Sequence, residues 1–375
     1  MLTIKIFSDI ADPFLKLCWE RLELECDAFP QNRYHWCLTW WSHLSQNRTL
    51  HAIAAFDTEN KAVAIAPFCI ERIFGFNILR SFPIQFGDYY SFIIKPGCEE
   101  ASFAAIFDYL ANSHSFNWIR LEQVQRSNPL YAQLTARGFL SKKMTASIIA
   151  NFEKLSWAQY LSKLHKQFRK NINSRQRKID NTFRANLCAI TNWSLFELEF
   201  NKMHTIHEQR WIDDYTPHKS TREKQCWFQA IQGQFISNKM VYYTMYFDEI
   251  LVAYRLGFIH KSVFYAWHTG YDINYRSYHP GVMMMTYMIR HFIENNINSV
   301  NFMAGEYDWK MQWSPDHITD IHYFFSSPST NVCSRLCNLY HHNLRDRFKL
   351  FYHFLMQNPF LRKISRILLS FKKQL

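Results

Sequence analysis

The chain has 375 residues, of which 48% are hydrophobic and 17% aromatic, and its formal net charge is +12. The length predicts two domains of ordinary size with packed cores. The positive charge favours an anionic partner, such as a phosphorylated cofactor, an acidic carrier protein, a nucleic acid or an anionic membrane. A basic protein without such a partner stays equally open, because overall charge does not separate the two.

The cysteines and the N-terminal segment indicate a cytoplasmic protein. The nine cysteines are scattered, and only Cys333 and Cys337 lie close together. No second Cys or His pair completes a zinc site, so we expect reduced thiols and no metal. The first residues lack a basic region followed by a long apolar run, and no run approaches the roughly 20 apolar residues that span a bilayer. We therefore expect neither a secretory signal nor a transmembrane helix.

The first half has the pattern of an α/β fold. Helical patches are expected up to residue 50. The elements predicted after them are strands at 51–56, 62–73 and 77–82, a helix at 99–112, a strand at 117–122 and a short helix at 129–137.

A basic helix is predicted next, from about Trp157 to Lys178. Its apolar residues follow helical spacing, and the only acid between Lys163 and Arg184 is Asp180. Two interpretations stay open. The basic face is either only solvated, or it attracts cofactor phosphates, an acyl-carrier protein or an anionic acceptor.

A second predicted helix, about 196–211, brings a histidine onto an apolar face. Phe196, Phe200, Met203 and His207 recur at steps of four, three and four residues. A single histidine in such a place is more often a core residue than a catalyst, so this pattern alone gives His207 no role.

The second half repeats the order of the first. Strands are predicted at 240–247, 250–259 and 263–268, followed by a helix at 282–296 and a strand at 299–303. Corresponding elements of the halves lie about 180–190 residues apart, as expected of a tandem duplication. We predict a degenerate N-terminal unit (1–152), a catalytic unit (153–330) and a basic helical tail (331–375).

The loop before the helix at 282–296 has the chemistry of a phosphate site. It contains Pro280-Gly281 and opens into a helix N-terminus, where free N–H groups and the helix dipole both favour an anion. After the helix and strand, Gly305 to Trp313 gathers a lysine, two carboxylates and three aromatic residues into nine positions. These two stretches are the candidate site.

Three separated pieces of the chain form a recognisable set. They are His207-Glu208-Gln209-Arg210-Trp211, then Gly270-Tyr271-Asp272 with Tyr275 and Pro280-Gly281, and then Gly305 with Tyr307, Lys310 and Trp313. Together they resemble the bacterial N-acyltransferase-like domain named after cellulose-biosynthesis proteins, which belongs to the GNAT acetyltransferase superfamily and is close to the Fem-type ligases. This sequence departs from the family pattern at Asn301-Phe302, where the family usually carries an aspartate before the phenylalanine.

The resemblance implies tandem acetyltransferase-like α/β units with mixed twisted sheets flanked by helices. It implies an acyl-CoA or acyl-carrier-protein co-substrate held at the loop before the helix, although Gly281 is the only glycine there. Arg276 or His279 would compensate by contacting phosphate. The residues expected to bind the cofactor are Tyr275, Arg276, His279, Pro280 and Gly281.

The resemblance also distributes catalytic roles. Lys310 is expected to face developing negative charge, and Tyr271 or Tyr307 to protonate the leaving thiolate. The candidate bases are Asp272, Glu306, Asp308 and His207, with Asp272 and Glu306 favoured because they flank the loop and helix. The residues expected to bind the acceptor or an anion are Arg169, Arg175, Arg210 and Trp211.

The tail has a composition of its own. It holds nine Lys or Arg residues and one acid, Asp346. Asn358-Pro359 predicts a new helix start, with an apolar side and basic residues elsewhere. This helix either packs on the protein's own core or, through 357–375, lies on an anionic membrane surface or a partner. A location on the inner face of the membrane is therefore an alternative to a purely cytoplasmic one.

The sequence favours an N-acyltransferase that moves an acyl group from acyl-CoA or an acyl-carrier protein to an amine, and the resemblance suggests a saccharide acceptor in cell-envelope or polysaccharide biosynthesis. Two rivals remain. One is a Fem-like ligase that uses aminoacyl-tRNA, which the basic helix would also suit. The other is a non-catalytic scaffold that docks a membrane-associated synthase, for which Asn301 and the poor glycine pattern are the best arguments.

Overall fold

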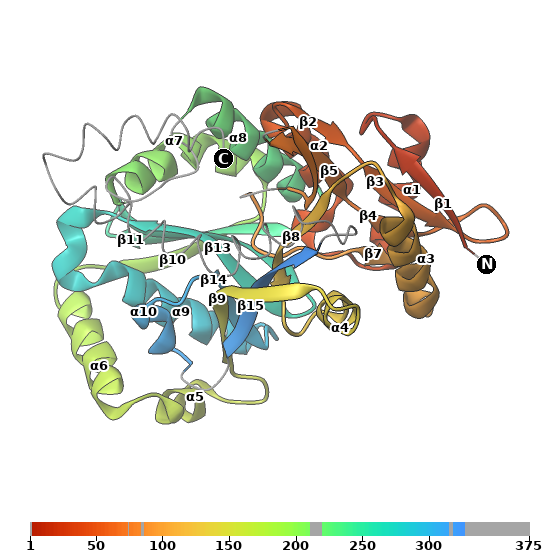
Figure 1. Cartoon of the computed structure of the whole chain (residues 1–375). Helices are drawn as coiled ribbons and strands as arrows, with labels where there is room; N and C mark the ends of the chain where they lie inside the picture. Colours follow the sequence, from red (N-terminus) through yellow and green to blue (C-terminus); the bar gives the residue numbers. More distant parts are fainter. Residues whose placement is uncertain (1, 74, 84–85, 211–219, 315–317, 327–375) are drawn as a thin grey trace, which may run out of the picture.

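The computed structural model describes residues 2–73, 75–83, 86–210, 220–314 and 318–326. Most of the strands form an 11-stranded mixed sheet in the order β10-β11-β12-β13-β14-β9-β15-β8-β6-β5-β2. The others form a 4-stranded sheet in the order β1-β3-β4-β7. Figure 1 shows the large sheet running through the molecule, with helices packed along it.

The two halves repeat one arrangement, as the sequence predicts. In each half, two parallel strands are joined by a helix that crosses over the sheet. In the first half these are β6 (Phe76–Ser81), α3 (Glu99–Asn112) and β8 (Trp118–Gln125). In the second half they are β13 (Val263–Tyr271), α9 (Pro280–Glu294) and β14 (Ser299–Ala304).

The remaining strands extend these pairs. Those of the first half are β1 (Thr3–Phe7), β2 (Arg48–Leu50), β3 (Ala52–Phe56), β4 (Ala62–Ala66), β5 (Phe68–Ile73), β7 (Ile93–Ile94) and β9 (Leu140–Asn151). Those of the second half are β10 (Ala185–Ile190), β11 (Met240–Phe247), β12 (Ile250–His260) and β15 (Ile318–Ser326).

The two units exchange strands at the centre of the sheet. β9 follows the first unit along the chain but pairs with β14 of the second, and β15 follows the second unit but pairs with β8 of the first. β9 and β15 also pair with each other. The crossed pairing makes one continuous sheet of the two units and fixes the loops of one against the strands of the other.

Helices cover both faces of the second unit. One face carries α7 (Trp193–Arg210) and α8 (Thr221–Ile236), and the other carries α5 (Trp157–Lys163), α6 (Lys166–Asp180) and α9. The other described helices are α1 (Pro13–Glu25), η1 (Pro30–Asn32), α2 (Tyr34–Leu44), α4 (Pro129–Ala136), η2 (Ile273–Tyr278) and α10 (Asp308–Met311).

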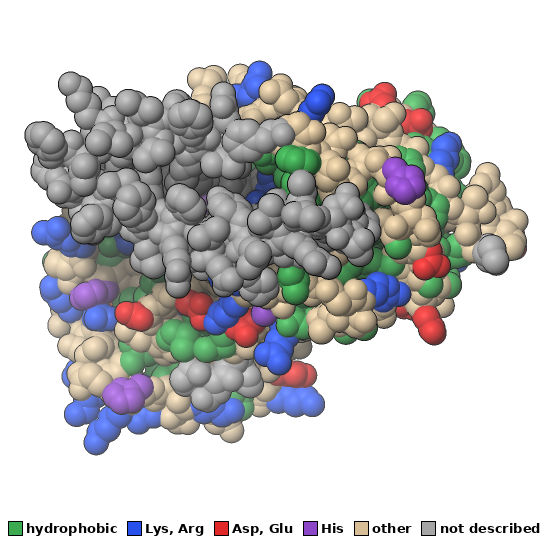
Figure 2. Space-filling model, viewed as in Figure 1, with side chains coloured by type: hydrophobic (Ala, Val, Ile, Leu, Met, Phe, Trp, Pro, Cys, Tyr) green, Lys and Arg blue, Asp and Glu red, His purple; other side chains and the backbone are tan. Residues whose placement is uncertain are grey.

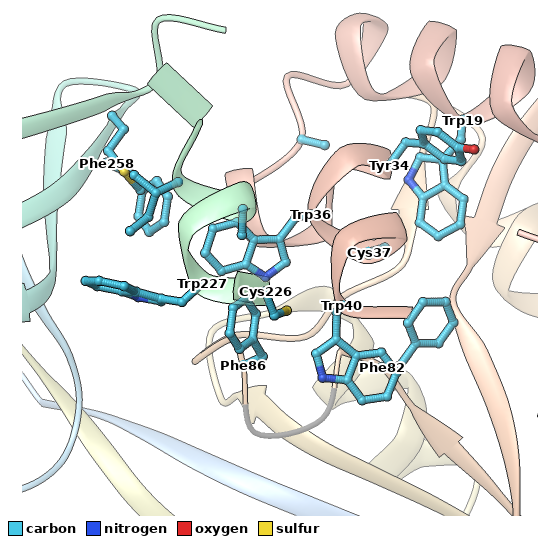
Figure 3. Close-up of a cluster of buried hydrophobic side chains, with 14 of the residues drawn as sticks. Trp19, Tyr34, Trp36, Cys37, Trp40, Phe82, Phe86, Cys226, Trp227 and Phe258 are labelled. Carbon is cyan, nitrogen blue, oxygen red and sulfur yellow. The ribbon is translucent and has the colours of Figure 1, made fainter. Parts of the chain in front are cut away.

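An aromatic cluster joins the two units. Trp36 of α2 lies against Phe258 and Trp267 of the second unit, with ring centroids 5.8 and 5.1 Å apart. Figure 3 shows Trp36 and Trp40 of α2 facing Cys226 and Trp227 of α8. Apart from Trp267, which is partly buried, these side chains are almost fully buried, so apolar burial stabilises the contact between the units.

The predicted basic helix is in fact two helices. Leu164 has an extended backbone, and the His165 side chain caps α6 by accepting from the Gln167 amide at 3.3 Å. The predicted strand at 62–73 is also divided, because Pro67 separates β4 from β5 and has no N–H for a ladder. The predicted helical tail lies outside the described residues.

Candidate active site

The two parallel strands of the second unit separate partway along their length. β13 and β14 pair only at Val263–Ser299, Phe264–Val300 and Tyr265–Asn301. Beyond these pairs β13 continues to Tyr271, while β14 keeps its pairing with β9 through Ala304. We call the region beyond Tyr265 and Asn301 the strand opening. There the facing edges of the two strands do not pair with each other, which leaves backbone groups of β13 for an extended ligand.

The N-terminus of α9 follows the separated part of β13. His279 adopts a left-handed conformation with φ of 52° and makes no side-chain cap, and Pro280 occupies the first turn. Burial and the nearby charges of Arg175 and Lys178 lower the pKa of His279. Lys178 Nζ also lies 4.3 Å from the ring centroid of Tyr278 in the same loop. The helix end is therefore surrounded by positive charge.

The predicted cofactor residues all lie in or beside this loop. Arg276 is exposed on η2, and Pro280 is buried. Tyr275 packs instead against Phe183 and Phe247 in the core beneath the loop, with centroids 6.1 and 5.9 Å away. A Cβ added at Gly281 would meet Tyr271 at an ordinary 3.7 Å, so packing alone does not require glycine there.

Lys310 is a buried lysine at the strand opening. It is 5% exposed, and its Nζ donates to the carbonyl of Ala304 at 2.8 Å and, more weakly, to that of Met303 at 3.4 Å. Both carbonyls belong to the part of β14 beyond the last pair with β13. Burial lowers the pKa of Lys310 to about 8, while the charge of Asp88 opposes that shift.

Gly305 allows this lysine to take its place. Its φ is +114°, and an added Cβ would lie 2.5 Å from the Tyr307 ring and 3.3 Å from Lys310 Nζ. Tyr307 is exposed, and its ring centroid lies 5.2 Å from Lys310 Nζ. The predicted Gly-Tyr-Lys motif thus forms one compact turn.

Asp88 is the residue that sequence reasoning missed. It lies in the loop before β7, in the first unit, and its backbone N–H donates to Gln31 Oε1 at 2.8 Å. Burial raises its pKa to about 6, with the charge of Lys310 acting in the opposite direction. No local motif marks Asp88, because only the packing of the two units brings it to Lys310.

Tyr89 fixes the Asp88 loop at the strand opening. Its hydroxyl donates to Asn301 Oδ1 at 2.7 Å, and the Met303 backbone N–H donates to the same oxygen at 2.8 Å. Asn301 stands where the resembled family has an aspartate. Here its side chain accepts from Tyr89, the neighbour of Asp88 in the same loop.

His207 lies on the opposite face of the sheet, in a histidine–tyrosine network. Its Nδ1 and that of His268 lie 3.0 and 2.9 Å from the Tyr254 hydroxyl, and the imidazole centroids are 4.0 Å apart. Burial, with the nearby charge of His204, lowers the pKa of His207 to about 4. The imidazole is therefore neutral at pH 7 and packed among aromatic side chains.

The other predicted bases lie at the surface or in turns. Glu306 is exposed and pairs with Lys143 of β9 at 2.8 Å, while Asp308 is exposed in the first turn of α10. Asp272 is partly exposed and accepts from the Asn274 N–H at 2.9 Å, beginning η2. Of the carboxylates discussed here, Asp88 is the one whose charge raises the pKa of Lys310.

The predicted anion-binding arginines lie in different surroundings and make different contacts. Arg169 donates to the Ser162 and Leu164 carbonyls at the end of α5, which gives it a structural role. Arg175 is half-buried on α6 beside His279. The Cζ atom of Arg210 lies 5.0 Å from the ring centroid of Tyr271. Trp211 is outside the described residues.

The described residues show neither a metal-binding cluster nor a membrane-spanning helix. No cluster of three or more His, Cys, Asp or Glu within the described ranges is arranged to hold a metal ion. Among the helices described above, none is long and apolar enough to cross a membrane.

Residues 166–311 match the family model of the acetyltransferase (GNAT) domain. A search of curated proteins gave no match. Among solved structures, FemX shares the fold with a TM-score of 0.52 and 10% identity, covering 76% of this chain and 90% of its own. The matched range contains the strand opening, α9 and Lys310, whereas Asp88 lies outside it.

Two further solved structures share the fold. The C-terminal domain of a lysylphosphatidylglycerol synthetase from Agrobacterium fabrum, described as putative in its own name, has a TM-score of 0.53 and 7% identity, with 86% of this chain and 93% of that one covered. L-PGS from Bacillus licheniformis has a TM-score of 0.50 and 9% identity, with 89% and 97% covered. At these identities the likeness establishes the fold alone.

Proposed function

From the premise that residues 166–311 form a GNAT acetyltransferase domain, we propose that this protein transfers an acyl group from a thioester to an amine at the strand opening. One observation carries the proposal. The opening between β13 and β14 adjoins both the electropositive start of α9 and the buried Lys310, whose charge interacts with that of Asp88. A phosphate-bearing thioester could thus bind at the start of α9, next to the strand opening where the amine would react.

The donor is acyl-CoA or an acyl-carrier-protein thioester. Its phosphates lie at the α9 N-terminus, near Arg276, His279 and Arg175, where backbone N–H groups and basic side chains favour anions. Its pantetheine arm extends along the separated edge of β13 and brings the thioester toward Lys310. The loop, poor in glycine, relies more on side chains than on backbone for this binding.

Asp88 and Lys310 divide the chemistry of transfer. The Asp88 carboxylate accepts the proton of the attacking amine, since a pKa of about 6 leaves it ionised at pH 7 yet basic enough to act. The C–N bond forms, and Lys310 stabilises the negative charge on the carbonyl oxygen. The C–S bond then breaks, and the Tyr307 hydroxyl supplies the thiolate's proton.

The tRNA-dependent ligase is the second candidate. The basic residues of α6, of which Lys166, Lys170, Arg177 and Lys178 are exposed, run beside the α9 N-terminus and would suit the phosphates of a nucleic acid. Figure 2 shows Lys and Arg side chains gathered at the edge of the molecule where Figure 1 places α6. Because FemX is only 10% identical to this chain, the comparison does not indicate which substrate such a ligase would use.

The acceptor and the site of action are proposed from the resemblance alone. A saccharide amine in cell-envelope or polysaccharide biosynthesis fits the family. The suggested membrane contact depends on 357–375, which lie outside the described residues. Weaker sedimentation with anionic liposomes after deletion of 357–375 would support that contact, and unchanged sedimentation would remove it.

A thermal-shift panel tests the donor directly. Purified full-length protein is heated with coenzyme A, acetyl-CoA, a long-chain acyl-CoA and aminoacyl-tRNA. A ligand at about 100 times its Kd adds roughly 2.7 kcal/mol, which raises the Tm of a chain of this size by several degrees. Stabilisation by a CoA thioester supports acyl transfer. Stabilisation by aminoacyl-tRNA alone supports the ligase, and a response to none favours a carrier-protein donor or a scaffold.

A further inference from the structure

A buried arginine beside the active site lacks a counter-ion. Arg255 lies on β12 and is 3% exposed. Within the described ranges no carboxylate pairs with it and no hydrogen bond to its guanidinium is found, and its Nε is buried without an acceptor. Its charged group instead faces the Trp309 ring, with Cζ 5.4 Å from the ring centroid.

Such an arrangement is unusual in a folded protein. A buried charge is normally paired, because removing it from water costs more than packing returns. A cation–π contact with one indole replaces only part of the lost hydration. A guanidinium has five N–H donors in a fixed fork that matches a carboxylate or a phosphate, so a bound anion would satisfy this group.

Arg255 is close to the reacting groups. It pairs across the sheet with Thr269, in the part of β13 that has separated from β14. The same Trp309 ring lies 5.8 Å from Lys310 Nζ, so both cations contact one indole. The described charges that interact here are thus two cations, Arg255 and Lys310, and one carboxylate, Asp88. The cluster therefore has one positive charge more than it has negative charges.

We propose that Arg255, beside Lys310, forms a subsite for an anionic group, a carboxylate or a phosphate, carried by the amine acceptor. This rests on the proposed function and narrows it: the acceptor is an amine that also bears an acid. Binding of the acid to Arg255 places the amine near Asp88, at the strand opening. An amine without an acidic group would leave Arg255 unpaired and bind poorly.

Arg255→Met tests the subsite, because methionine fills similar space without charge. We would measure the Tm of full-length wild-type and variant protein in chloride buffer at fixed ionic strength. Inorganic phosphate and acetate would then be titrated separately as probes. The unliganded variant is expected to melt at the same temperature as wild type or higher, since it loses an unpaired buried charge. Its affinity for the effective probe should fall about tenfold or more.

Three comparisons make the result decisive. Arg72→Met, at an exposed position of β5, should leave probe affinity unchanged. Arg255→Lys keeps the charge but loses the fork, and should bind phosphate better than acetate if the ligand is a phosphate. Coenzyme A should stabilise wild type and Arg255→Met equally, since its phosphates bind at α9.

Two outcomes would overturn the subsite. The first is an Arg255→Met variant that melts well below wild type while its probe affinity is unchanged, which would mean that buried water satisfies Arg255. The second is a wild-type protein that responds to neither probe. Absence of any coenzyme A effect would count against the proposed donor instead, and the phosphate and acetate results would still decide the subsite.

Discussion

The charges of Asp88 in the first unit and Lys310 in the second interact at the strand opening, although 222 residues separate them in the chain. Burial moves their pKa values toward each other, to about 6 for Asp88 and about 8 for Lys310. Their mutual attraction opposes both shifts. Both groups are therefore charged at pH 7. A fall in pH of about one unit begins to neutralise Asp88, and a rise of about one unit begins to neutralise Lys310.

This relationship predicts a bell-shaped pH dependence of kcat/KM. Activity should fall below about pH 6, as Asp88 takes up a proton and stops accepting one from the amine. It should also fall above about pH 8, as Lys310 loses its charge. The two limbs belong to the pair rather than to single residues. Steady-state rates between pH 5 and 9 would measure them, and a flat profile over this range would contradict the assignment.

Replacing either residue should lower activity without loss of the fold. Lys310→Met is expected to lower kcat by about 100-fold or more, as removal of an oxyanion-stabilising group does. Asp88→Asn should lower kcat and remove the acid limb of the pH profile. Asp308→Asn, at an exposed position nearby, serves as the control and should change little. If Glu306→Gln instead removed the acid limb, Glu306 would be the base.

A pair of glycine variants separates backbone strain from the placement of Lys310. Gly305 and Gly97 both have positive φ, +114° and +83°, but only at Gly305 would an added Cβ meet neighbouring atoms within 4 Å. Both alanine variants should lose roughly 1 kcal/mol or more of unfolding free energy, measured in urea, because alanine is strained at such φ. Only Gly305→Ala should also lose activity, since its Cβ displaces Tyr307 and Lys310. Equal activity of the two variants would show that the turn does not position the lysine.

The sequence predicted the repeated elements well because their periodicity is strong. The strand at 240–247 and the helix at 99–112 have the predicted bounds. It missed β9 and β15, whose pairing partners belong to the other unit. It also predicted one helix where α5 and α6 meet, because local propensity did not reveal the His165 cap.

Prediction of the site was limited in the same way. Lys310 and the α9 loop belong to local motifs that can be recognised in one stretch of chain. Asp88 and Arg255 have no such signal, because tertiary packing alone gives them their neighbours. Arg169 shows the converse, since it matches a motif and yet donates to two carbonyls of α5.

The donor site can be tested through its charges. Arg276→Met with Arg175→Met should weaken coenzyme A binding by about 100-fold or more, because each charged hydrogen bond to phosphate is worth about 1.5–3 kcal/mol and the double variant removes two. Binding of acetyl-pantetheine, which lacks the nucleotide phosphates, should change little. Calorimetry of both ligands would measure this, with Arg72→Met as the matched control. Equal weakening of both ligands would indicate damage to the loop rather than loss of phosphate contacts.

The buried histidines predict a stability that falls in acid. The folded-state pKa of His207 is about 4, below its unfolded value of about 6.5. Between these values the unfolded chain binds a proton that the native protein does not, so stability is lost as pH falls from about 6.5 toward 4. A shift of this size corresponds to about 3 kcal/mol at most. Burial lowers the pKa of His260 to about 4 as well, which adds to the loss.

His207→Gln should therefore flatten the pH dependence of unfolding while lowering stability at pH 7. Glutamine cannot be protonated in this range, so one of the two histidine contributions disappears, and the shape of the Tyr254–His268 contacts is partly lost. Urea unfolding at pH 4.5 and 7 would measure both effects. His114→Gln, at an exposed position, is the control and should leave the slope unchanged. If His207→Gln abolished activity but left both the stability and its pH dependence unchanged, His207 would be catalytic. Replacing a histidine that stabilises the core should change the free energy of unfolding.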